Sequence, residues 1–185
     1  MSRHACAFGA LILMTVTAHA ADWRLDPAGS KLTFKSSYQG QAAPGEFKKF
    51  NTQMRFDPAR PADGRLDVIV KLDSFDMGSS EINDAIREPD WFDLKRFPDG
   101  EFHSAEIRQT APGRYLARGT LRLKGTQQPV EVPFTWKDGG KSAQMAGELK
   151  LNRSNFGIGT GEWKSGDVIG LDVVVDFDVR LQRVK

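Results

Sequence analysis

The pattern that most constrains the fold is a strict alternation of apolar and polar side chains between residues 171 and 181. Every second position is apolar, at Leu171, Val173, Val175, Phe177, Val179 and Leu181. Most positions between them are charged. Successive side chains of a β-strand point to opposite faces, so this period of two predicts a strand with one apolar and one polar face.

Seven further stretches show the same alternation, some more weakly, at residues 32–34, 50–56, 66–72, 102–107, 115–123, 130–136 and 145–151. Turn-forming pairs such as Asp57-Pro58 and Pro112-Gly113 separate several of them. Amphipathic antiparallel strands close most simply into a barrel or pack as a tight sandwich, because closure removes exposed edges. We therefore predict an all-β fold of about eight strands.

Outer-membrane barrels share this alternation but turn their apolar face outward to lipid, between girdles of tyrosine and tryptophan. This chain has only two tyrosines, Tyr38 and Tyr115, and it ends on the charged sequence Arg-Leu-Gln-Arg-Val-Lys. We therefore favour a barrel with its apolar face inside.

Residues 79–92, with the sequence SSEINDAIREPDWF, interrupt the alternation. A serine that can cap a helix comes first, Ile82 and Ile86 are four residues apart, and Pro89 ends the pattern. We predict one short helix here, carrying Ile82, Ile86, Trp91 and Phe92 as an apolar lid over the mouth of the barrel.

The first 20 residues have the pattern of a secretory signal peptide. Arg3 precedes an apolar run from Ala5 to Val16, and Ala18-His19-Ala20 matches a cleavage sequence. The run is shorter than the roughly 20 residues that a membrane helix needs. We predict cleavage after Ala20, a periplasmic location, and one domain over residues 21–185, without a transmembrane segment.

Cleavage at this point would remove Cys6, His4 and His19, leaving His103 as the only histidine and no thiol. Cys–His zinc sites, cysteine nucleophiles and multi-histidine metal sites are thereby excluded. The formal net charge is only +2 for the whole chain and no basic stripe is present, so nucleic acid is not an expected partner.

The glycine-rich sequence NRSNFGIGTGEWKSGDVIG spans residues 152–170. A phosphate-binding glycine loop follows a strand and opens a helix, whose N-terminus supplies the aligned N–H groups. A strand pattern follows this segment instead, so we interpret it as a hairpin connection. His103 and the aspartates at 172, 176 and 178 are expected on the outer face, where they form no nucleophile–base pair, and we predict no enzymatic activity.

Several short stretches occur in a characteristic order along the chain: Trp23-Arg24-Leu25-Asp26, Gly45-Glu46-Phe47, Pro89-Asp90-Trp91-Phe92-Asp93, Phe102-His103-Ser104, Leu123-Lys124-Gly125, Asn152-Arg153 and Phe156-Gly157-Ile158-Gly159. Together they resemble the YceI-like family of exported polyisoprenoid-binding proteins. Two histidines common in the family are absent, since this chain has Tyr38-Gln39-Gly40 and Ile82-Asn83-Asp84-Ala85-Ile86 at those places.

The resemblance implies an eight-stranded antiparallel lipocalin-like barrel that carries or sequesters a long isoprenoid lipid or quinone in an apolar tunnel, without a covalently bound cofactor. Similar proteins are associated with membrane b-type cytochromes, so the alternative is a packed barrel that acts as an interaction module for such a partner. The expected ligand-binding residues are Phe34, Tyr38, Phe47, Phe50, Ile82, Ile86, Trp91, Phe92, Phe97, Phe102, Phe134, Arg153, Phe156 and Trp163. Tyr38 and Arg153 are candidates for the polar end of the tunnel, although Arg153 is equally a candidate for a buried partner of an aspartate.

Overall fold

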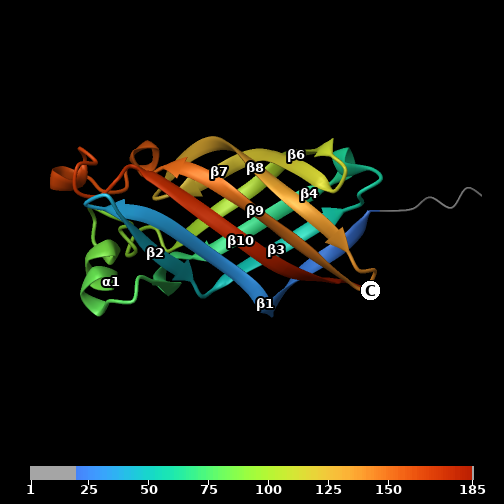
Figure 1. Cartoon of the computed structure of the whole chain (residues 1–185), viewed down its shortest axis with the longest axis horizontal. Helices are drawn as coiled ribbons and strands as arrows, with labels where there is room; N and C mark the ends of the chain where they lie inside the picture. The colour runs from blue at the N-terminus through green and yellow to red at the C-terminus, as the bar shows by residue number, and fades with distance from the viewer. Residues whose placement is uncertain (1–19, 185) are drawn as a thin grey trace, which may run out of the picture.

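The computed structural model of the chain describes residues 20–184, which form mainly antiparallel strands (Figure 1). The strands are β1 (Ala21–Tyr38), β2 (Gln41–Phe47), β3 (Phe50–Phe56), β4 (Arg65–Lys71), β5 (Phe75–Asp76), β6 (Asp99–Ala111), β7 (Arg114–Leu123), β8 (Thr126–Asp138), β9 (Ser142–Asn152) and β10 (Asp172–Arg183). Short 3-10 turns lie at Pro61–Asp63, Leu72–Ser74, Arg153–Phe156 and Gly161–Trp163, and the helix α1 spans Ser80–Arg87. All but the last residue of the predicted signal peptide lies outside the described residues, so its cleavage stays a prediction.

The strands form a closed barrel. Neighbours are hydrogen-bonded in the order β10, β9, β8, β7, β6, β4, β3 and β1, and β1 pairs again with β10. The short strands do not add to this circle, because β2 and β3 pair with different halves of β1 and β5 pairs only with β2. The prediction of an eight-stranded antiparallel barrel with one helix is therefore confirmed.

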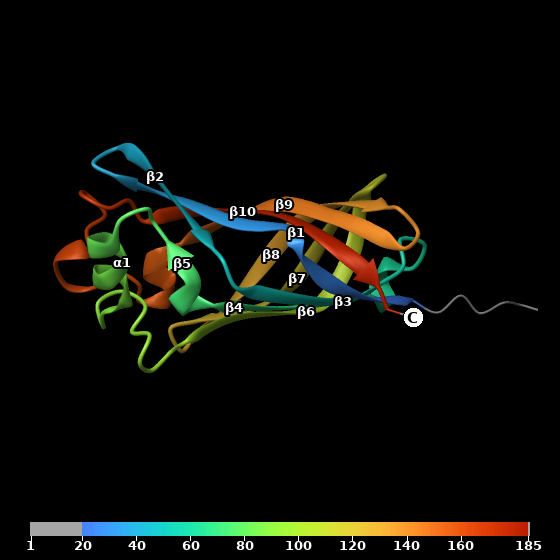
Figure 2. The ribbon, with the colours of Figure 1, turned by 90° about the horizontal axis from the view of Figure 1, so that it is seen from below.

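Closure depends on the register between the first and last strands. Trp23 pairs with Arg183 and Phe34 with Val175, with a register shift between Asp26 and Lys31. Pro27 lies in this interval and has no N–H to donate to the ladder, which explains the irregularity. Figure 2 shows the hairpin between β1 and β2 reaching past the barrel wall at the same end as α1.

The apolar residues of the alternating pattern point into the barrel, and aromatic side chains fill the end away from α1. The buried residues there include Trp23, Phe56, Tyr115, Phe134 and Trp136. Phe56 lies at their centre, with its ring centroid 5.0 Å from those of Tyr115 and Trp136 and 5.9 Å from that of Phe134. We call these five residues the aromatic plug.

The helix lies where the sequence predicted, between the capping Ser79 and Pro89. The Ser79 hydroxyl accepts a hydrogen bond from the Ile82 N–H at 3.4 Å, and the helix ends at Arg87. The expectation that Trp91 and Phe92 belong to the helix was wrong, because Pro89 forces Glu88 into an extended conformation and the two aromatics follow in a turn. Within residues 20–184, no helix has the length and apolar character needed to cross a membrane.

Candidate functional site

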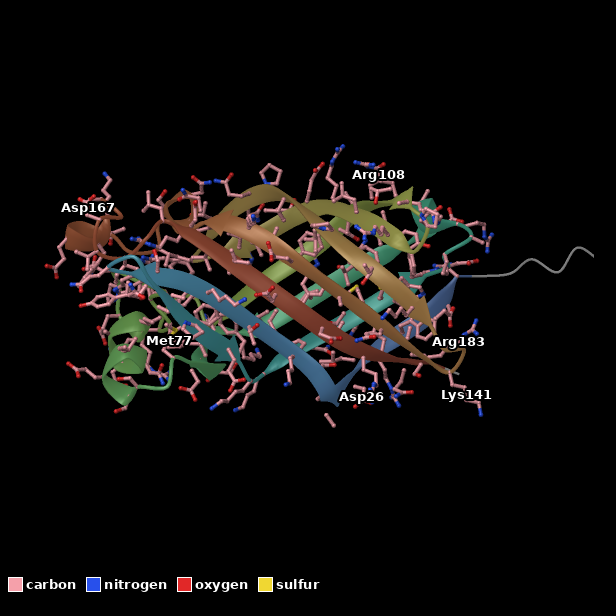
Figure 3. The ribbon with its side chains drawn as sticks, viewed as in Figure 1. Asp26, Met77, Arg108, Lys141, Asp167 and Arg183 are labelled. Carbon is pink, nitrogen blue, oxygen red and sulfur yellow. The ribbon has the colours of Figure 1, made fainter. Side chains whose placement is uncertain are left out.

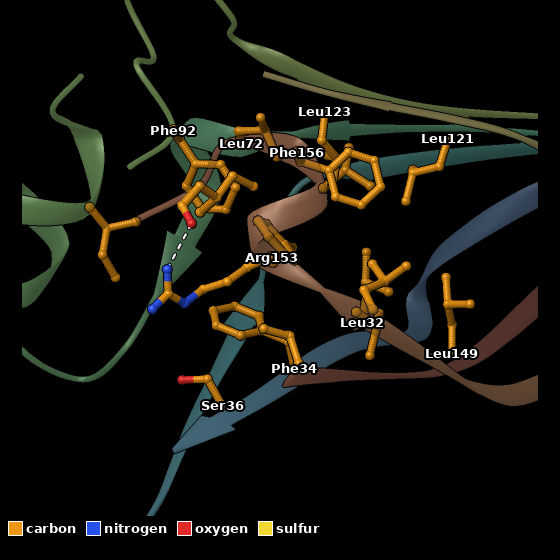
Figure 4. A pocket seen from close by; sticks show the side chains of 18 of the residues that line it. Leu32, Phe34, Ser36, Leu72, Phe92, Leu121, Leu123, Leu149, Arg153 and Phe156 are labelled. Atoms are coloured by element: carbon orange, nitrogen blue, oxygen red, sulfur yellow. Dashed lines mark hydrogen bonds between the residues drawn. The ribbon is translucent and has the colours of Figure 1, made fainter. Parts of the chain in front are cut away.

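A cavity of about 700 Å³ occupies the barrel on the α1 side of the aromatic plug. Its rim residues Tyr38 and Ile82 are 51% and 46% exposed, so the cavity opens to solvent at this end. Figure 4 looks into it, with Leu121 and Leu149 on the wall. Ligand pockets have volumes of about 300 to 1,000 Å³, so this cavity has the size of a binding site.

Side-chain packing differs between the two ends of the barrel. At one end the rings of the aromatic plug pack against one another. The inward positions of the other half carry many aliphatic side chains, which leave the centre open; examples are Leu32, Val68, Val70, Leu123, Leu149, Val173 and Val175. An eight-stranded barrel is just wide enough to be filled by large side chains or to hold one small ligand. In this chain, large side chains fill the barrel at one end, and a cavity that can hold a ligand occupies the other end.

Four segments surround the opening, and we call them together the mouth: the hairpin tip at residues 38–41, α1, residues 88–92 and residues 157–170. Helix α1 turns Glu81, Ile82, Ala85 and Ile86 toward the cavity. None of its residues is buried, so it covers the opening thinly. Its first turn is held by Asn83, whose side chain accepts from the Met77 N–H at 2.9 Å.

Arg153 organises the mouth from inside. Its side chain is buried, with 4% exposure, and all five of its N–H groups donate to backbone carbonyls. Nε donates to Gly170 (3.0 Å), one terminal nitrogen to Ile158 (2.8 Å) and Gly159 (3.0 Å), and the other to Trp163 (2.6 Å) and Ile169 (2.7 Å). Figure 4 shows its guanidinium directed away from Leu121 and Leu149. No carboxylate pairs with it among the described residues, and burial lowers its pKa from the ordinary value.

The glycine-rich segment is a hairpin connection between β9 and β10, as predicted. Gly157, Gly159 and Gly161 all have positive φ, between 61° and 75°, which favours glycine. A Cβ on Gly159 would also lie only 1.9 Å from a terminal nitrogen of Arg153. The glycines therefore let the backbone wrap closely around this arginine.

The segment is also tied to residues 88–92. The Asp90 carbonyl accepts hydrogen bonds from the N–H groups of Gly159 (2.7 Å) and Thr160 (2.9 Å). The Trp91 ring lies 6.0 Å from that of Trp163 and 5.3 Å from the guanidinium of Arg153. These contacts join two of the four mouth segments to each other.

The structure brings twelve of the fourteen predicted site residues to the cavity wall or its rim. They are Phe34, Tyr38, Phe47, Phe50, Ile82, Ile86, Trp91, Phe92, Phe102, Arg153, Phe156 and Trp163. The placement of Phe134 was wrong, because it is stacked on Tyr115 within the aromatic plug. That of Phe97 was also wrong, since its ring packs beside Gly125 under the Arg96 guanidinium, outside the cavity. Ligand contact by the twelve stays a prediction.

Sequence reasoning missed most of the aliphatic wall and the few polar groups. The aliphatic residues occupy the same alternate, inward-facing strand positions as the aromatic ones. This alternation, or inward parity, is the signal that could have identified them. Among polar side chains, Ser36 and Thr52 line the cavity, and Thr52 is almost fully buried. Glu81 lies at the rim on the cavity side of α1.

The carboxylates considered for catalysis lie outside the barrel. Asp176 pairs with Lys35 at 3.2 Å and Asp178 accepts from Gln144 at 2.6 Å, while the alternate residues Val175 and Phe177 line the cavity. His103 is on the outer face as predicted, with Nδ1 2.7 Å from Asp67. Residues 20–184 contain no group of three or more potential metal ligands.

The cavity also bears on the alternative of a solidly packed barrel, which was wrong, because an open cavity of about 700 Å³ occupies part of the interior. The membrane cytochrome expected as a partner in that alternative stays a prediction.

Known proteins resemble this chain in both sequence and fold. Residues 23–181 match the model of the YceI-like domain. The UPF0312 protein plu2095 of Photorhabdus laumondii is 31% identical over 159 residues, which are 80% of this chain and 82% of that protein. The crystal structure of Burkholderia cenocepacia BcnA is 35% identical with a TM-score of 0.82, covering 84% of this chain and 98% of BcnA.

A more distant structure has the same fold. A domain from Saccharophagus degradans, described as polyisoprenoid-binding and implicated in plant cell wall breakdown, is 17% identical with a TM-score of 0.71. The alignment covers 90% of this chain and all of that domain. With the family match spanning nearly every residue of the barrel, the chain belongs to the YceI-like family.

Proposed function

We propose that this protein carries or sequesters a long isoprenoid lipid or quinone in the periplasm. The observation that carries the proposal is the cavity of about 700 Å³, walled by aliphatic and aromatic side chains and open at one end. An isoprenoid tail is long, flexible and apolar, so it matches a cavity that is closed at the bottom and offers few polar partners. The description of the Saccharophagus degradans domain as polyisoprenoid-binding supports this ligand class.

The energetics suit a reversible carrier. Burying each CH₂-sized group contributes about 0.8 kcal/mol, so a few isoprene units supply on the order of 10 kcal/mol. Association and the ordering of a flexible chain cost about 4 to 15 kcal/mol. At the lower end of that cost the net gain is about 6 kcal/mol, an affinity that allows both capture and release. The proposal needs no catalytic group.

The periplasmic location rests on the signal-peptide pattern of residues 1–20. Fractionation of cells that produce the full chain tests it, together with the N-terminal sequence of the exported form. Cleavage after Ala20 and recovery with periplasmic proteins is the expected result. An uncleaved protein in the cytoplasm would contradict the location without affecting the ligand.

Native mass spectrometry of the protein purified from an exporting host, followed by organic extraction, tests the ligand. A discrete added mass that extracts as an isoprenoid or quinone is expected. The matched control is Val68→Trp, which places a large ring at a cavity wall residue and should remove the added mass by exclusion. An unmodified mass that persists after incubation with quinones would refute the proposal and turn attention to a protein partner.

A further inference from the structure

Among the described residues, no free cation lines the cavity where the head group of a bound lipid would lie. Arg153 is the only arginine or lysine among the cavity-lining residues. Its five N–H groups are all engaged by the carbonyls of Gly170, Ile158, Gly159, Trp163 and Ile169. A diphosphate would need donors of this kind, and displacing five carbonyls to free them would dismantle the loop that forms the mouth.

Glu81 is the charged side chain of the cavity lining that remains available. It lies on the cavity-facing stripe of α1 with Ile82, Ala85 and Ile86. No hydrogen bond or ion pair engages its carboxylate among the described residues. The other acidic residue of the lining, Glu101, is already paired with Arg122 and His103 on the outer face.

The rest of the mouth also carries mainly negative charge. Its segments carry six carboxylates, Glu81, Asp84, Glu88, Asp90, Glu162 and Asp167, against the two side-chain cations Arg87 and Lys164. Arg87 is occupied, since it donates to the Asp73 carbonyl at 3.3 Å and lies over the Phe75 ring. Figure 3 shows Asp167 at the mouth and the cations Arg108, Lys141 and Arg183 at the opposite end of the barrel.

We infer that the mouth selects lipids by head-group charge, accepting neutral head groups such as an alcohol or a quinone and disfavouring diphosphates, with Glu81 as the residue that sets this preference. The inference rests on the proposed function and names the class of lipid within it. The apolar cavity holds the tail whatever the head group, so the discrimination arises at the rim. Like charges repel more strongly beside the apolar cavity than in bulk water.

Two probes with the same tail separate the head group from the chain: geranylgeraniol and geranylgeranyl diphosphate. Their dissociation constants for the delipidated protein are measured by quenching of tryptophan fluorescence, below the concentration at which either probe forms micelles. Trp91 and Trp163 at the mouth provide the signal. We expect the alcohol to bind about tenfold more tightly at low salt, and the ratio to fall as salt screens the charges.

Variants then test whether Glu81 causes the difference in affinity between the two probes. Glu81→Gln should reduce the ratio several-fold and Glu81→Lys should reduce it further. The control Asp63→Asn removes another exposed carboxylate, in the turn between β3 and β4, away from the mouth, and should leave the ratio unchanged. Equal affinities for the two probes would overturn the charge selection while leaving lipid binding intact. A ratio that Glu81→Lys does not change would overturn the role of Glu81, and failure of geranylgeraniol itself to bind would count against the proposed function.

Discussion

Replacing Arg153 by methionine removes the hydrogen-bonding centre of the mouth while keeping a side chain of similar length. Five backbone carbonyls then lose the donors that they have in the folded protein. Each buried polar group left without a partner costs about 1 to 3 kcal/mol. Water can reach part of the loop, and the variant no longer buries an unpaired charge, so we expect a net loss of about 3 to 5 kcal/mol.

Urea unfolding of the delipidated protein, followed by tryptophan fluorescence, measures this loss. For a chain of this size, 1 kcal/mol corresponds to about 2 to 4 °C in melting temperature, so a fall of about 10 °C is expected as well. Arg153→Lys should recover no more than half of the loss, because one ammonium group cannot reach carbonyls on several sides at once.

A free energy of unfolding for Arg153→Met within about 1 kcal/mol of the parent would refute this reasoning. If lipid binding were lost at the same time, Arg153 would instead contact the head group directly. The two roles are separable because the measurement is made without lipid.

Three further predictions concern the mouth, the aromatic plug and the anchor of α1. Phe92→Asp should abolish co-purified lipid and leave the far-UV circular dichroism unchanged, while the same substitution at Ile69, on the outer face, should retain the lipid. Phe56→Ala should lower the free energy of unfolding by about 3 to 5 kcal/mol, since it opens a hole at the centre of the aromatic plug. Lys48, with the Gly78 N–H and Asn83, holds the pKa of Asp76 far below its ordinary value. The stability that Asp76 contributes is therefore present above the unfolded pKa of about 3.9 and lost as the pH falls below it, and unfolding of Asp76→Asn beside the parent across that range measures the difference.

Each of these has a result that would contradict it. If Phe92→Asp retained the lipid, Phe92 would not contact the ligand at the mouth. A loss below about 1 kcal/mol for Phe56→Ala would mean that the plug repacks around the missing ring. A stability difference between Asp76→Asn and the parent that stays constant from neutral pH to pH 3 would show that the carboxylate is not the titrating group.

Alternation in the sequence was sufficient to predict the barrel but not the course of every strand. β2 was missed because Pro44 and Gly45 weaken its pattern, although the pairing with β1 supplies its hydrogen bonds. β1 was seen only at Leu32–Phe34, since Pro27 interrupts the alternation earlier in the strand. Both strands are held by partners that a local pattern does not reveal.

The sequence predicts which side chains point into the barrel, but not how far along the barrel axis (at what height) each one lies. Phe50 and Phe134 have the same inward parity, yet Phe50 lines the cavity and Phe134 lies in the aromatic plug. Height depends on the strand register, which comes from pairing across the whole sheet. The sequence also left the role of Arg153 undecided. Its partners are backbone carbonyls, which every residue has, so the identities of the neighbouring residues do not reveal them.

The pairing of β1 with β10 joins the earliest strand of the barrel to the latest. Trp23 and Arg183 are paired although they lie near opposite ends of the chain, so we expect this long-range closure to be the slowest step of folding. Until then, the sheet has two open edges and an uncovered apolar surface, the state in which chains associate with one another. Factors that hold the nascent chain apart from its neighbours should thus raise the yield of folded protein without changing its final stability.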